Sequence, residues 1–136
     1  MACDAEVIVV GAGPAGISAS IQLKRYGREV ALFEGAVPGG LLRNAWLVEN
    51  YPGFPGGIRG ADLAALFRRQ LEESGVRVIN ERVDSLEYRE GEGGGLFAAR
   101  SRSALREAAI ALVASGTVPL IPRQISIGEG AGERIL

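Results

Sequence analysis

Two short apolar runs flank a helical pattern near the start of the chain. Residues 6–10 read EVIVV and residues 29–34 read EVALFE, and consecutive β-branched or large apolar residues are typical of strands buried on both faces. Between them, apolar positions recur at helical spacing from Pro14, which suits a first helical turn, to Gly27, which suits a helix stop. The pattern predicts a strand–helix–strand unit with parallel strands and a right-handed crossover.

The pattern changes after this unit. Residues 35–60 are rich in Gly, Pro and aromatic residues, which predicts a long irregular loop packed on the domain, with Trp46 anchoring it by packing. In residues 61–75, apolar side chains recur at i, i+3, i+4 and i+8. They are Leu63, Leu66, Phe67 and Leu71. This spacing predicts an amphipathic helix that ends at Gly75.

The second half of the chain has strand patterns. Residues 76–80 predict a short third strand, and the apolar positions from Val83 to Tyr88, followed by a glycine-rich turn and LFAAR, predict a hairpin. Residues 108–116 read AAIALVASG, which predicts one continuous buried strand. The expected fold class is α/β: a Rossmann-like parallel sheet with a βαβ dinucleotide unit plus a small antiparallel hairpin or meander.

Length and composition limit the classes of protein that remain. A chain of 136 residues suits one domain; we expect it to span residues 1–122, with residues 123–136 as a tail or linker of a composition compatible with disorder. The formal charge is −1, without runs of like charge, so no nucleic-acid partner is expected. The sequence has one cysteine, Cys3, expected to be an inert thiol, and no histidine. A disulfide framework, a metal site and a Ser/His or Cys/His pair are therefore not expected.

Targeting signals are also not expected. The N-terminal residues carry an acid where a signal peptide needs basic residues. No stretch of the sequence approaches the roughly twenty apolar residues that cross a bilayer. We therefore expect a cytoplasmic protein without a membrane partner.

The turn after the first predicted strand is rich in glycine. Gly11, Gly13 and Gly16 follow the order GxGxxG between strand and helix. In a dinucleotide-binding turn the first glycine permits a tight turn, the second lets the backbone approach a pyrophosphate, and the third lets helix and strand pack closely. The helix N-terminus then favours the anion. The alternative is a glycine-rich turn used only for packing.

An acidic residue supports dinucleotide binding. Glu34 ends the second predicted strand, eighteen positions after Gly16, close to the spacing of about 20 residues expected for the acid that holds ribose hydroxyls. Because NAD and FAD share this fingerprint, the turn and the acid leave the choice of nucleotide open.

The loop that follows resembles a known family. Residues 35–60 read GAVPGGLLRNAWLVENYPGFPGGIRG. Its Gly-Gly pair followed by Val-Glu-Asn-aromatic-Pro-Gly resembles the flavin-side segment of thioredoxin reductase-like, FAD-dependent pyridine nucleotide-disulphide oxidoreductases. Residues 113–116, VASG, resemble the Ala-Thr-Gly strand end of that family. The resemblance covers most of residues 5–122 and implies FAD as the cofactor.

The resemblance also implies where FAD would bind. It puts the pyrophosphate on the glycine turn, the adenosine ribose on Glu34, the ribityl chain and flavin ring along Gly40 and Leu41, and the adenine at the backbone of Val83. Asn50 would hydrogen-bond near the ring; its alternative is a turn residue. The full implied set is Gly11, Gly13, Pro14, Ala15, Gly16, Glu34, Gly35, Gly40, Leu41, Leu42, Asn50, Val83, Ala114, Ser115 and Gly116. Leu41 departs from the family, which commonly has glutamine there.

The expected function is electron or hydride transfer through bound FAD. The resemblance would also lead us to expect a second glycine motif for NAD(P)H and a Cys-x-x-Cys disulfide, and these 136 residues contain neither. Three alternatives stay open: a subunit whose partner chain carries the NAD(P)H domain, a stand-alone FAD-binding carrier that forms a homodimer, and a fragment. No catalytic side chain is identified.

Overall fold

A four-stranded parallel sheet forms the centre of the domain. The computed structural model describes residues 5–90 and 94–117. The sheet runs in the order β3-β2-β1-β7, formed by β1 (Val7–Val10), β2 (Val30–Phe33), β3 (Arg77–Ile79) and β7 (Ile110–Val113). Val7 of the central strand β1 pairs with Val30 on one side and with Ile110 on the other, in parallel register. Helix α1 (Pro14–Arg25) joins β1 to β2, so the predicted βαβ unit is confirmed.

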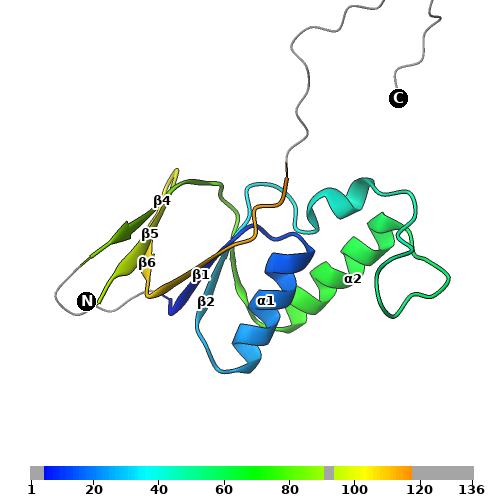
Figure 1. Cartoon of the computed structure of the whole chain (residues 1–136), viewed down its shortest axis with the longest axis horizontal. Coiled ribbons are helices and arrows are strands. Elements are labelled where there is room, and N and C mark those ends of the chain that lie inside the picture. Colours follow the sequence, from blue (N-terminus) through cyan, green and yellow to red (C-terminus); the bar gives the residue numbers. More distant parts are fainter. Residues whose placement is uncertain (1–4, 91–93, 118–136) are drawn as a thin grey trace, which may run out of the picture.

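Different elements cover the two faces of this sheet (Figure 1). Helices α1 and α2 (Gly60–Glu73) lie on one face, and a three-stranded antiparallel meander, in the order β4-β5-β6, lies on the other. The meander consists of β4 (Val83–Arg89), β5 (Leu96–Ser101) and β6 (Leu105–Ala108). A short 3-10 helix, η1 (Gly40–Asn44), precedes α2. The predicted fold class is confirmed.

The apolar runs of β1 and β2 supply both halves of the core. Val7, Val9 and Leu32 belong to the cluster packed against the helices. Ile8 and Phe33 belong to the cluster on the meander side. Successive side chains of a strand point to opposite faces, so continuous apolar runs are what a sheet covered on both faces requires.

The expectation of one buried strand over residues 108–116 is wrong. Ala108 ends β6 in the meander, and β7 begins at Ile110 in the parallel sheet. One apolar run therefore supplies two strands in two sheets. Among the described residues β7 pairs on one side alone, with β1, and its Ile110 and Val113 are 56% and 63% exposed.

Two further details of the packing differ from expectation. Tyr51 and Phe54 of the loop do pack against the helix-side core, and the ring of Tyr51 lies 5.4 Å from that of Phe67 at a steep angle. Trp46, however, is 82% exposed, so the expectation that it anchors the loop by packing is wrong. Leu66, expected on the apolar face of α2, is 45% exposed.

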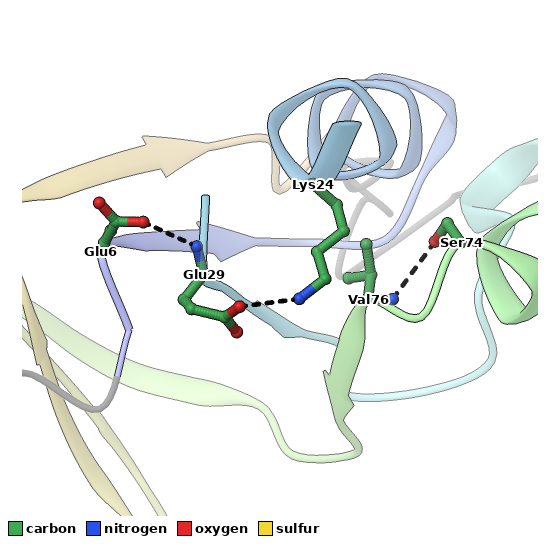
Figure 2. A network of polar contacts seen from close by, with 5 residues as sticks. All are labelled: Glu6, Lys24, Glu29, Ser74 and Val76. Atoms are coloured by element: carbon green, nitrogen blue, oxygen red, sulfur yellow. Dashed lines mark hydrogen bonds and ion pairs between the residues drawn. The ribbon is translucent and has the colours of Figure 1, made fainter. Parts of the chain in front are cut away.

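Polar contacts hold the loops at the amino edge of the sheet (Figure 2). A Glu6 carboxylate oxygen accepts a hydrogen bond from the Glu29 amide at 2.9 Å, and Lys24 forms an ion pair with the Glu29 side chain at 3.0 Å. After α2, the Ser74 hydroxyl accepts a hydrogen bond from the Val76 amide at 3.3 Å. Exposed ion pairs of this kind stabilise a fold by about 0–1 kcal/mol.

Glu81 lies in the segment between the parallel sheet and the meander, and its side chain binds the meander. It lies between β3 and β4, and its carboxylate accepts hydrogen bonds from the Ser101 hydroxyl at 2.5 Å, from the Ser103 amide at 3.1 Å and from the Ser103 hydroxyl. These bonds favour the charged form. The hydroxyl of Ser101 and then the hydroxyl and amide of Ser103 hold the pKa of Glu81 below its ordinary value.

A Glu81→Gln variant tests this contact through pH. A lowered folded pKa contributes stability above the unfolded pKa, and that stability is lost as pH falls through the folded pKa. We expect the variant to be less stable than wild type at neutral pH, with the difference shrinking in acid below the ordinary glutamate pKa. Urea unfolding midpoints measured across pH check this, with Glu72→Gln, an exposed position on α2, as the control. A constant difference at all pH values would contradict the expectation.

Candidate dinucleotide site

The glycine turn lies at the carboxyl end of β1 and matches the predicted tasks of its outer glycines. Gly11 has φ +102°, and a Cβ there would overlap the Ala114 carbonyl. A Cβ on Gly16 would overlap the carbonyl oxygen of Gly11. The Ala114 amide donates to the Val10 carbonyl at 2.8 Å. The turn, the first helical residues and the end of β7 are therefore in backbone contact.

Gly13 is different because its side-chain position is open. It has ordinary extended backbone angles, φ −75° and ψ −177°, and nothing lies within 4 Å of a Cβ built on it. Its role is thus not imposed by strain or by packing. Helix α1 begins directly after it, with Pro14 in its first turn and no acidic side chain there. An open cradle in front of unpaired helix amides suits an anion such as a pyrophosphate.

Two backbone amides orient the Glu34 carboxylate. One oxygen accepts a hydrogen bond from the Ala12 amide at 2.8 Å, and the other accepts from the Ala36 amide at 2.9 Å. The side chain is half-buried at the end of β2. A carboxylate offers about four acceptor positions, so each oxygen keeps capacity for another donor. This arrangement fits a pair of ribose hydroxyls.

Other predicted residues gather around the same edge. A Cβ on Gly40 would lie 3.2 Å from the Gly13 Cα, and the Gly39 amide donates to the Ala12 carbonyl at 2.7 Å. On the other side, a Cβ on Gly35 would lie 2.9 Å from the Cβ of Arg82, the residue before Val83. Segments from five parts of the chain thus meet at one edge. Ligands of open α/β sheets bind at this edge.

Of the remaining predicted residues, Ala15 lies within the glycine turn, and Ser115 lies against it, since a Cβ on Gly11 would be 3.0 Å from the Ser115 Cα. Ala15 lies exposed in the first turn of α1, and Ser115 and Gly116 are exposed beyond β7, with Gly116 at φ +69°. Leu41 is 52% exposed and Asn50 is exposed. Leu42 instead packs against the helix-side core.

The reasoning from sequence missed backbone contributors. Ala12 and Ala36 orient Glu34 through amides, which no side-chain pattern reports. Gly39 has φ +118°, and a Cβ on it would lie 2.9 Å from the Cβ of Ala64. The Gly39-Gly40 pair in the sequence could have indicated this close approach of the loop to α2.

A cavity lies away from the glycine turn, between α2 and β3. Its volume is about 310 Å³, and it is lined by α2 and β3 residues together with Pro38, including Leu71 and Val78. It contains none of the predicted cofactor-binding residues, so we place the candidate site at the glycine turn, where the sequence motif and the strand ends meet. Over residues 5–90 and 94–117, no cluster of three His, Cys, Asp or Glu side chains is arranged for a metal. No helix in the described part of the chain is long and apolar enough to cross a membrane.

Comparisons with known proteins agree on one family. The family model described as pyridine nucleotide-disulphide oxidoreductase matches residues 5–125. A thioredoxin reductase of Borreliella burgdorferi is 33% identical over 114 residues, which cover 84% of this chain and 34% of that protein. NADPH-dependent thioredoxin reductase 3 of Arabidopsis thaliana is 44% identical over 84 residues, 59% of this chain and 16% of that protein.

Solved structures lead to the same family. Thioredoxin reductase of T. acidophilum superimposes with a TM-score of 0.73 and 35% identity, over 84% of this chain and 36% of that one. The Lactococcus lactis enzyme gives a TM-score of 0.79 and 27% identity, over 88% of this chain and 38% of that one. The chain thus spans between about a sixth and two fifths of the relatives it matches.

Proposed function

This chain belongs to the pyridine nucleotide-disulphide oxidoreductase family, and from that premise we propose that it binds FAD and takes part in electron or hydride transfer. It is a thioredoxin reductase-like domain of that family. The observation that carries the FAD proposal is the open cradle at Gly13, beside a Glu34 carboxylate with free acceptor capacity. Packing accounts for glycine at Gly11 and Gly16, but it does not account for glycine at Gly13, where a side chain would meet no neighbour.

The proposed roles of the residues follow from their positions. Gly13 and the first amides of α1 bind the pyrophosphate, and Glu34 accepts from the ribose hydroxyls. Ala12 and Ala36 hold that carboxylate in place through their amides. Gly35 and Val83 lie at the adenosine in this proposal. Gly40, Leu41 and Asn50 lie toward the flavin, and residues 114–116 approach the cofactor from the carboxyl edge of the sheet. When bound, the flavin supplies the hydride and electron transfer, and the protein supplies position and local polarity. Cytoplasmic location stays a prediction.

Binding and reduction of flavin test the proposal. The purified chain of 136 residues is incubated with FAD, FMN or NAD⁺, freed of unbound ligand, and analysed by absorption and by identification of the released nucleotide. We expect retention of FAD over FMN, because FMN lacks the adenosine and the pyrophosphate bridge. Anaerobic addition of NADH or NADPH then asks whether bound FAD is reduced. Preference for NAD⁺, or equal binding of FMN and FAD, would contradict the proposal.

We also propose that a further strand pairs with the outer edge of β7. Among the described residues β7 pairs with β1 alone, its Ile110 and Val113 side chains are exposed, and no charged residue lies in Ile110–Val113 to discourage edge pairing. The strand would come from a second copy of the chain, from a partner chain that carries an NAD(P)H domain, or, if these 136 residues are a fragment, from the rest of the same protein.

An Ile110→Lys variant separates the first source from the other two. If two copies pair through β7, wild type sediments as a dimer and the variant as a monomer, because a charge at the edge opposes pairing. If a partner chain or the rest of the same protein supplies the strand, wild type sediments as a monomer. Tyr26→Lys, at a position 71% exposed after α1, is the control. A dimer unaffected by Ile110→Lys would contradict edge pairing.

A further inference from the structure

Trp46 exposes a large apolar surface that packing does not explain. It is the single tryptophan of the chain and is 82% exposed. Its neighbours in the same loop, Tyr51 and Phe54, pack against the core. Burial of an aromatic side chain stabilises a fold, so an open indole forgoes that contribution.

Neighbouring groups nevertheless hold the indole from one side. The guanidinium carbon of Arg59 lies 5.5 Å from the centre of the Trp46 ring, within the range of a cation–π contact. Arg59 directly precedes α2. The Gly60 amide donates to the carbonyl of Ala45, the residue before Trp46, at 3.0 Å. One ring face is thus covered by a cation at the start of a helix, and most of the ring stays open.

The position of Trp46 along the chain relates it to the proposed cofactor site. Helix η1 starts at Gly40, which lies against Gly13 in the glycine turn. Trp46 follows η1 after one residue, Ala45, so it belongs to the segment that leaves the glycine turn at Gly40. In the proposed binding mode the flavin lies along this same segment, because Trp46 stands between Leu41 and Asn50 in the sequence.

Resting on the proposed function, we propose that Trp46 stacks on the isoalloxazine ring of FAD. The indole is an electron-rich plane with one face open, and the flavin is an electron-poor plane, so the two are complementary in shape and charge distribution. Arg59 holds the indole from its outer face. Leu41, 52% exposed at the start of η1, adds apolar surface to the same segment.

Two spectroscopic readouts and the affinity test this contact in the full chain. Stacking on an indole quenches flavin emission, and bound FAD quenches the emission of the single tryptophan. We expect Trp46→Ala to weaken FAD binding about tenfold or more, in line with the loss of an aromatic stacking contact, and to raise the emission of bound flavin severalfold. Trp46→Tyr restores most of the affinity. Tyr26→Ala, an exposed aromatic after α1, is the matched control and leaves both readouts unchanged.

The outcomes separate this inference from the proposed function. If wild type binds FAD and Trp46→Ala binds it equally with unchanged flavin emission, the stacking contact is refuted while FAD binding stands. If wild type retains no FAD, the proposed function fails and the stacking contact fails with it. Far-UV circular dichroism of each variant verifies folding; because Trp46 is exposed, we expect the spectra to superimpose on that of wild type.

Discussion

Gly13→Val is expected to abolish FAD binding while leaving the fold intact. A Cβ at Gly13 has nothing within 4 Å and its backbone angles suit any residue, so valine is accommodated without strain. Its methyl groups, however, fill the cradle that the pyrophosphate would occupy. We expect retention of FAD to fall below detection in gel filtration monitored by flavin absorption, with a thermal unfolding midpoint close to that of wild type.

The control for Gly13→Val is a glycine that is equally open and outside the proposed site. Gly56 has nothing within 4 Å of a built Cβ and no positive φ, so Gly56→Val adds the same side chain at comparable structural cost. FAD binding by this control should match that of wild type. A Gly13→Val protein that keeps FAD would show that the open position does not serve the pyrophosphate.

Glu34→Ala is expected to weaken FAD binding by roughly a hundredfold or more. The alanine removes the acceptors for the two ribose hydroxyls, and hydrogen bonds to charged groups contribute about 1.5–3 kcal/mol each. It also leaves the Ala12 and Ala36 amides without the oxygens that they contact at 2.8 and 2.9 Å. Part of the expected loss of FAD affinity therefore comes from disorder of the turn. Calorimetric titration with FAD measures the total loss of affinity.

Glu34→Gln separates the roles of charge and shape. The amide keeps one acceptor oxygen and nearly the same size, so we expect a loss of affinity between those of wild type and Glu34→Ala. A comparison with Glu49→Ala, an exposed acid in the loop before Asn50, controls for net charge. Unchanged FAD binding by the Glu34→Ala variant would contradict the assignment of Glu34 to the ribose hydroxyls.

The parallel part of the fold was predictable because its signals are local. Residues 7–10 and 30–33 are apolar at every position, as strands covered on both faces require. The glycine at the first position of the turn matches the φ of +102° found at Gly11. Periodicity also located α2, which ends at Glu73, just before Gly75.

The end of the meander was not predictable from the same signals. Strand β6 reads LREA, with two charged residues in four, so it lacks an apolar pattern of its own. Its last residue, Ala108, joins an apolar run that continues into β7 across a bend at Ala109. No glycine or proline marks that boundary, because the chain changes sheets within a continuous hydrophobic segment.

The side chains of the candidate site could be predicted from the sequence better than the backbone groups that contact them. Glu34 could be found from its spacing to Gly16, but the amides that orient it could not, since every residue except proline has one. The exposure of Trp46 was missed because aromatic residues in loops are generally buried by packing. Tertiary contacts decide whether an aromatic side chain in a loop is buried. For Trp46 the contact is with Arg59 over one face of the ring, and the rest of the ring is exposed.

An amide NMR titration of the chain with FAD tests whether the cofactor binds at the glycine turn. We expect the largest shifts for the amides of Gly11, Ala12, Gly13, Gly16 and Ala36, which line the turn and the Glu34 carboxylate. Shifts confined to the cavity between α2 and β3, or no shifts at saturating FAD, would contradict the assignment of the glycine turn as the cofactor site.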